Sequence, residues 1–438
     1  MELMNRCFEK SIKVLSTARL AEISREYQRF NFHPAVIQLV LLCAESSDPL
    51  NLSHSYYLNE QKEGQEKFQM REKLYKFAFS VISDLMSKAP LTKQIEDLKK
   101  SCFLVCFSNQ DELFHIQLFD WLIANGYSEE LINSTSPFVE RYLISCYEQS
   151  IDLADLLWKH YGVRKEYLKA AKFLLKIALD MKGIALDKRL YYLTLAMTNA
   201  KSVRDGSAEL SDFIVEIEER LQIARLQSSV LSAVRERDAT QAENLEYNIL
   251  SISELFNMYT SPMNLPELSL QIIDYSGHQD ATLVNQLWTE IINQAQDNMA
   301  LLSAKIVDTC RKLSKTAHIV PLDSLVMILE KMCLMKKDLI EAGWLPKTLL
   351  SAQIAPHKIF ESLNRLVELK ITPWNGPSAL LFLLDDIRIL FELSSTDTIP
   401  SKVLNDCVSN YLLQLTTLNI GQEIMNEFRV LQRKLSSK

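Results

Sequence analysis

Apolar side chains recur along the chain at the spacing of one face of an α-helix. In residues 168–178 the apolar positions follow one another at steps of three, four and three, and similar stripes cover 210–224, 322–332 and 380–391. Helical side chains return to one face about every 3.6 residues, whereas strand side chains alternate with a period of two. The pattern therefore predicts an all-α chain of roughly twenty helices, with no β-sheet.

Residues typical of helix ends lie between these stripes. Asn109 followed three residues later by Glu112 is the spacing of a capping box, in which each side chain satisfies a backbone N–H at the helix start. Gly126, Gly162 and Gly277 each follow an apolar stripe. We expect these glycines to adopt the left-handed conformation that ends many helices.

One long polar connector, residues 46–64, interrupts the helical pattern and is predicted to form a mobile loop. No fixed-period repeat occurs. Without a strict repeat, the helices should stack in antiparallel fashion as an irregular, elongated α-solenoid. We expect one continuous solenoid over residues 1–438.

Composition excludes several classes of function. Only nine of the 438 residues are glycine, about 2%, against about 7% in average proteins, so glycine-rich phosphate loops are not expected. The net charge of −7 disfavours a nucleic-acid partner. Eight cysteines occur without a C-x-x-C pair, which is typical of reduced thiols. The longest apolar runs, 36–44 and 379–384, are far shorter than the ~20 residues that span a bilayer.

The candidate metal sites lack ligands. Cys102 and Cys106 stand one helical turn apart, but zinc needs two further ligands, and His115 is the only neighbour in the sequence. Asp385 and Asp386 resemble the paired aspartates of all-helical Mg²⁺-diphosphate enzymes. A further carboxylate is needed one turn on, where this chain has isoleucine. We therefore predict no catalytic residue, no metal and no cofactor.

Trp344 and Trp374 are the two tryptophans in predicted connectors, and they are the candidate partner-binding residues. Aromatic side chains dominate the energetics of protein interfaces, so a tryptophan in a connector can contact a partner segment. The alternative is structural, since such a tryptophan can also fill the joint between adjacent helices.

Several segments resemble the large inner-ring scaffold nucleoporins that lack FG repeats, the one-hundred-and-fifty-five-kilodalton class. The likeness begins at DELFHIQLFDWLI (111–123), and its order and spacing continue over about residues 100–438. Residues 1–100 match more loosely. The other segments that carry the likeness are 136–143, 155–162, 221–227, 268–292, 321–330 and 380–392.

Members of this family have an N-terminal β-propeller followed by an α-solenoid, and this chain looks like the solenoid part alone. The resemblance implies a structural constituent of the nuclear pore complex in the nuclear envelope. Its partners would be linker segments of FG-bearing nucleoporins and neighbouring inner-ring subunits, in support of protein and mRNA transport. Membrane contact would belong to the absent propeller. The turn at 277–281 departs from the family pattern, so its partner contacts are not carried over.

Two alternative functions remain at this point. An α-solenoid subunit of a vesicle coat or trafficking complex would share the architecture, and only the segments quoted above argue against it. An all-helical Mg²⁺-dependent enzyme is more distant, because the aspartate pair lacks its further carboxylate.

Overall fold

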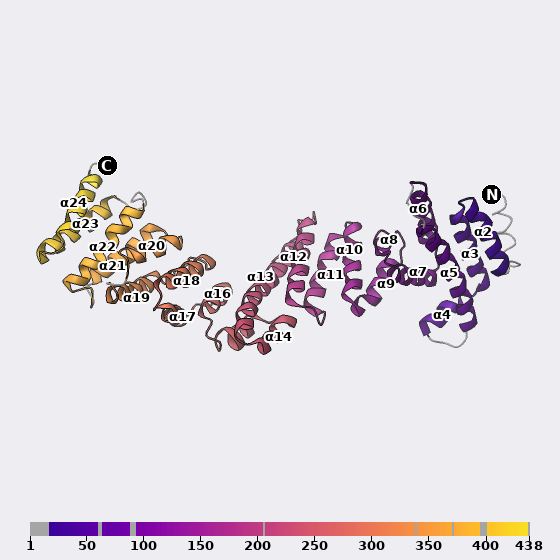
Figure 1. Ribbon diagram of the computed structural model, residues 1–438, viewed down its shortest axis with the longest axis horizontal. Helices are drawn as coiled ribbons and strands as arrows, with labels where there is room; N and C mark the ends of the chain where they lie inside the picture. The colour runs from indigo at the N-terminus through magenta and orange to yellow at the C-terminus, as the bar shows by residue number, and fades with distance from the viewer. Residues whose placement is uncertain are drawn as a thin grey trace. The chain divides into compact units, whose positions relative to one another are not determined.

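The computed structural model describes residues 17–59, 64–87, 93–204, 206–337, 340–369, 372–394 and 401–436 (Figure 1). These residues form 23 α-helices, one 3-10 turn and one π-helical turn, and no strand occurs among them. The predicted all-α fold is confirmed. Over the same residues, no helix combines the length and apolarity needed to cross a bilayer.

Contacts divide the chain into two compact units, one of residues 1–184 and 188–219 and the other of 185–187 and 220–438. The prediction of one continuous solenoid stays a prediction. The helices of the first unit, the last of which contains the division, are α2 (Thr17–Arg29), α3 (His33–Ser47), α4 (Leu52–Asn59), α5 (Gln65–Met86), α6 (Lys93–Ser108), α7 (Glu112–Ala124), α8 (Ser128–Ile132), α9 (Val139–Cys146), α10 (Ile151–Val163), α11 (Tyr167–Asp180), α12 (Leu186–Ser202) and α13 (Ala208–Arg237).

The second unit continues the same architecture. A π-helical turn, Leu255–Thr260, follows a one-turn helix at its start. The helices are α14 (Ala239–Tyr247), α15 (Ile252–Glu254), α16 (Pro266–Ser276), α17 (Ala281–Ala295), α18 (Met299–Lys312), α19 (Leu322–Met335), α20 (Trp344–Ser351), α21 (Pro356–Leu369), α22 (Pro377–Leu393), α23 (Ser401–Leu418) and α24 (Gln422–Ser436).

Neighbouring helices pack side by side, as α10 does with α11 and α21 with α22 (Figure 1). The longer helices bury apolar stripes, and in α11 the buried positions include Ala171, Leu175 and Ala178. One apolar core runs from Leu20 to Ala170 and a second from Leu270 to Phe428. Burying a leucine side chain contributes about 1.5–3 kcal/mol, so these stripes are the main source of stability.

The predicted loop at 46–64 is wrong over 52–59, because α4 forms there. Asp48 closes the helix start: its carboxylate accepts hydrogen bonds from the backbone N–H groups of Leu52 (3.0 Å) and Ser53 (2.9 Å). Asp48 is in turn buried against Arg71, a residue of α5. Residues 60–63 lie outside the described part of the chain.

Two predicted helix ends also differ from the structure. The cap of α7 is Asp111, whose side chain accepts from the N–H of Leu113, and not Asn109, which instead accepts from the N–H of Asp111. Gly162 lies within the last turn of α10 and is not left-handed. Gly126 and Gly277 have φ values of 77° and 66°, so the prediction for these two glycines is confirmed.

Candidate peptide-binding groove

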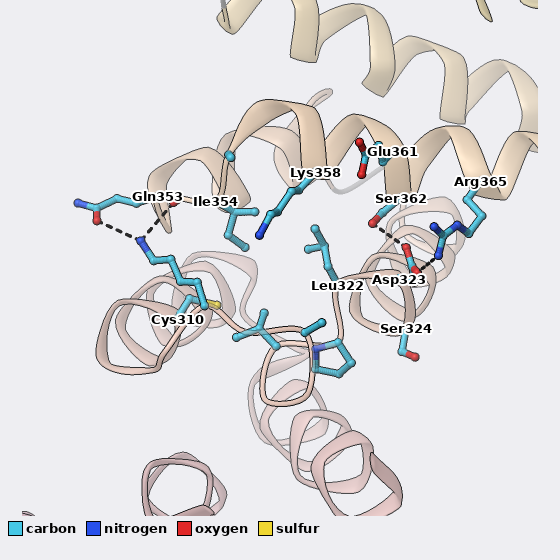
Figure 2. A pocket seen from close by; sticks show the side chains of 15 residues that line it. Cys310, Leu322, Asp323, Ser324, Gln353, Ile354, Lys358, Glu361, Ser362 and Arg365 are labelled. Atoms are coloured by element: carbon cyan, nitrogen blue, oxygen red, sulfur yellow. Dashed lines mark hydrogen bonds and ion pairs between the residues drawn. The ribbon is translucent and has the colours of Figure 1, made fainter. Parts of the chain in front are cut away.

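A groove opens on the second unit where α19 and α21 pack together (Figure 2). Its volume is about 480 Å³, within the range of small-ligand and short-peptide sites. One wall is the connector that leads from α18 into α19, and the other wall is the connector that leads from α20 into α21. Because the two connectors are irregular, they leave a hollow that regular helix packing would have filled.

The floor of the groove is apolar. Val320 and Ile354 are almost fully buried, while Pro321 and Leu322 are half-buried and face the opening. Cys310 lies beneath them with no exposed surface, and burial raises the pKa of its thiol to about 12. A thiol with so high a pKa stays protonated at neutral pH and is a poor nucleophile. The floor therefore offers apolar contact and no reactive group.

Each end of the groove is closed by polar contacts. At one end the Lys315 ammonium donates to the backbone carbonyl of Gln353 (3.2 Å) and to its side-chain oxygen (3.3 Å). At the other end Asp323 accepts from the Ser362 hydroxyl (2.8 Å) and pairs with Arg365. The first set of contacts joins the two connectors, and the second joins α19 to α21, so both stabilise the shape of the groove.

Lys358 lies between these closed ends. It extends from α21 toward the centre of the groove, opposite Leu322 (Figure 2). It is exposed, and no ion pair with another residue of the described chain engages it. Its ammonium group is therefore available to an acidic partner.

The groove is electrostatically suited to a carboxylate. Three basic and two acidic side chains line it, although the chain as a whole carries a charge of −7. The helix α19 begins at the groove with Pro321 as its cap residue, and no side chain in the described part of the chain caps its first N–H groups. The N-terminal end of a helix carries a partial positive charge. An acidic side chain beside an apolar one would thus find both contacts here.

The tryptophans predicted to bind partners do not line this groove. Trp374 is only 2% exposed and belongs to the apolar core of the second unit. Trp344, at the start of α20, is half-buried and packs against the same core. The burial of Trp374 fits the structural alternative, and Trp344 keeps some surface for contact. Partner binding at both residues stays a prediction.

No pattern in the sequence indicated this groove, because its residues come from separate segments and include no motif. Lys315, Lys358 and Arg365 share a positive charge, but ordinary solvent-exposed helices also carry such side chains.

The candidate metal ligands have other roles. Cys102 and Cys106 are fully buried in the apolar core of the first unit. The ring nitrogens of His115 contact the Asn109 carbonyl (2.9 Å) and the Ser136 hydroxyl (3.1 Å). Asp385 pairs with Arg388, whereas Asp386 is buried beside Glu330. Among the described residues no group of three or more potential ligands could hold a metal ion.

Comparison with known proteins gives consistent matches. The family model described as non-repetitive/WGA-negative nucleoporin C-terminal matches residues 4–423. A probable nucleoporin of Schizosaccharomyces pombe is 25% identical over 416 residues, which cover 90% of this chain and 32% of the relative. Nuclear pore complex protein Nup154 of Drosophila melanogaster is 27% identical over 403 residues, covering 82% and 29%. The chain thus spans about a third of the length of these relatives.

Solved structures share the fold. The Nup170 CTD of Chaetomium thermophilum, in a complex with Nup145N, superposes with a TM-score of 0.83 at 20% identity, covering 99% of this chain and 94% of that one. A further structure of the Nup170 CTD gives a TM-score of 0.76, with 99% and 90% coverage at 20% identity. The predicted α-solenoid fold is confirmed by this likeness.

Proposed function

The chain belongs to the family of non-repetitive nucleoporin C-terminal domains, and from this premise we propose that its solenoid binds linker segments of other nucleoporins within the nuclear pore complex scaffold. The family is structural and not enzymatic, in agreement with the prediction of no catalytic function. The same family match sets aside the vesicle-coat alternative and the Mg²⁺-dependent enzyme.

The groove between α19 and α21 is the observation that carries this proposal. A linker segment is extended, and it can place one apolar side chain over Leu322 and Pro321 and one carboxylate beside Lys358. Short anchors of this kind give weak, reversible contacts, which repetition in a large assembly strengthens. The complex of the Chaetomium thermophilum Nup170 CTD with Nup145N supports the idea that solenoids of this fold accept a segment of another nucleoporin.

The place of the chain in the inner ring, its contacts with neighbouring scaffold subunits and its support of protein and mRNA transport are part of the same proposal. They rest on the family resemblance of the segments in residues 100–438. Trp344 remains a second candidate contact, because it is the connector tryptophan that keeps exposed surface.

Charge reversal in the groove should weaken linker binding. We expect Lys358→Glu to raise the dissociation constant of an acidic, apolar linker peptide about tenfold or more, because attraction becomes repulsion; tenfold corresponds to about 1.4 kcal/mol. Leu322→Glu should act similarly by placing a charge on the apolar floor. Fluorescence anisotropy with short overlapping peptides from the non-FG linkers of nucleoporins measures both effects.

Lys331→Glu is the matched control, since Lys331 is an exposed lysine of α19, the helix that carries Leu322, and lies outside the groove. It should bind the peptides as the unaltered chain does. Equal affinities for Lys358→Glu and Lys331→Glu would show that linkers bind elsewhere.

A further inference from the structure

A second groove, in the first unit, differs in character from the one described above. It lies where α4 contacts α7 and α7 contacts α9, and its volume is about 670 Å³. Ile116, Phe138 and Leu153 line it as half-buried apolar side chains. On its rim, the last turn of α4 presents Tyr57, which is 44% exposed, and Leu58, which is 56% exposed. This groove therefore has both an apolar lining and apolar side chains left open to solvent.

The two carboxylates that line this groove have different partners. Glu112 is engaged by His54 (3.4 Å) and by Arg141 (3.1 Å). Asp120 is exposed and accepts one hydrogen bond, from the hydroxyl of Tyr142 (2.5 Å). Within the described ranges of the chain, no basic side chain pairs with Asp120. Asp120 thus leaves an uncompensated negative charge in the groove.

Two tyrosines that line the groove lie near this charge. Burial raises the pKa of Tyr57, and the nearby charge of Asp120 raises it further. Burial likewise raises the pKa of Tyr142, as does its hydrogen bond to Asp120. Both tyrosines therefore stay neutral at physiological pH, and the hydroxyl of Tyr142 contacts the Asp120 carboxylate.

A carboxylate beside aromatic rings is suited to a cation. A guanidinium or ammonium group gains an ion pair with the carboxylate and an attraction to the negative faces of the rings. The phosphates of a nucleic acid or of an anionic lipid would meet repulsion from Asp120. Because the lining is apolar, the cationic residue should also have aliphatic or aromatic residues beside it in its own chain.

We propose that this groove binds a polypeptide segment in which one arginine or lysine stands between apolar residues, with its cationic group against Asp120 and the rings of Tyr57 and Tyr142. The apolar neighbours of that residue contact Ile116, Phe138 and Leu153. This interaction surface is additional to the groove at α19 and α21. Its occupant is basic, whereas the occupant proposed for the other groove is acidic.

An array of immobilised heptapeptides tests the proposal with the full chain. Every peptide carries arginine at its centre and varied apolar residues around it, and a second set replaces arginine by citrulline, which has nearly the same shape and no charge. We expect a subset of arginine peptides to bind, and their citrulline counterparts to bind at least about tenfold more weakly. Lysine in place of arginine should retain binding.

Variants of the chain assign the binding to the groove. Asp120→Asn keeps the size of the side chain and its contact with Tyr142, and should weaken binding of arginine peptides about tenfold. Tyr57→Leu keeps an apolar side chain but removes the ring, so it should lower affinity several-fold. Asp84→Asn, at an exposed aspartate of α5, is the matched control and should bind as the unaltered chain does.

Three results would each overturn the proposal: no arginine peptide binds, citrulline peptides bind equally well, or Asp120→Asn binds like Asp84→Asn. Lys358→Glu separates the two grooves, because it should weaken acidic linker peptides and leave arginine peptides unaffected. The proposal for either groove can therefore be refuted independently of the proposal for the other.

Discussion

Replacing Arg71 by methionine is expected to lower the free energy of unfolding of the first unit by about 3–5 kcal/mol, because two acidic side chains would lose their buried cationic partner. The Arg71 side chain is 4% exposed. Its guanidinium contacts Asp111 (2.7 Å), Asp48 (3.3 Å) and the side-chain oxygen of Asn51 (2.7 Å). One residue of α5 thereby holds the start of α4 and the start of α7.

The loss should be local as well as large. Hydrogen exchange should accelerate first in α4, since Asp48 and Asn51 lie at the start of this helix and would have no cation to hold them. Urea unfolding followed by circular dichroism measures the change in free energy. Arg29→Met is the matched control: the Arg29 side chain is 73% exposed and pairs with Glu26 in the same helix, so stability should stay within experimental error. A loss for Arg71→Met below about 1 kcal/mol would show that the buried network contributes little.

Replacing Glu330 by glutamine is expected to stabilise the second unit at neutral pH. Glu330, in α19, has no exposed surface, and its carboxyl group lies beside that of Asp386. Burial raises its pKa well above the usual range, and the charge of Asp386 raises it further. Asp386, in α22, accepts a hydrogen bond from the N–H of Gly343 (3.1 Å), yet burial raises its pKa to about 6. At neutral pH, folding of the unaltered chain therefore requires proton uptake by these carboxyl groups. A glutamine at position 330 is neutral and needs no proton.

The pH dependence follows from these directions. An acid with a raised pKa in the folded state binds its proton more tightly there than in the unfolded chain. The stability of the unaltered chain should therefore fall as the pH rises from about 4, near the unfolded values of the two acids, through about 6 and beyond. Glu330→Gln should therefore be more stable than the unaltered chain at pH 8, by an amount on the order of the 1–3 kcal/mol common for single substitutions, and should differ little from it at pH 4.

Urea unfolding at a series of pH values measures this gain. Glu423→Gln serves as the control, because Glu423 is exposed on α24 and its replacement should leave the pH profile unchanged. A profile for Glu330→Gln that runs parallel to that of the unaltered chain would contradict the prediction.

Local patterns were sufficient to predict the helices. The apolar stripe over 210–224 lies within α13, because burial of such a stripe is the main force that stabilises a stacked helix. The left-handed conformation of Gly126 and Gly277 is predicted from their place directly after an apolar stripe, which is also a local feature of the sequence. Neither prediction depends on residues far away in the chain.

Features that depend on distant partners were missed. The helix α4 has a weakly amphipathic, polar sequence, and its start depends on Asp48 and, through it, on Arg71, which lies 23 residues further along the chain. Asp386 was considered as a metal ligand beside Asp385, but its actual neighbour is Glu330 of another helix. Both grooves likewise join residues from several helices. No pattern of sequence spacing could have brought those residues together.

Buried cysteines in each unit can report how often the surrounding helices open. Cys102 and Cys106 lie in α6 of the first unit, and Cys310 and Cys333 lie in α18 and α19 of the second, all with almost no exposed surface. Because burial also raises the pKa of each thiol, an alkylating reagent can modify these residues only after the surrounding helices open. The rate at which each cysteine is alkylated, measured by mass spectrometry of peptides, would then report how often each unit opens locally. No residue of the chain has to be replaced for this measurement.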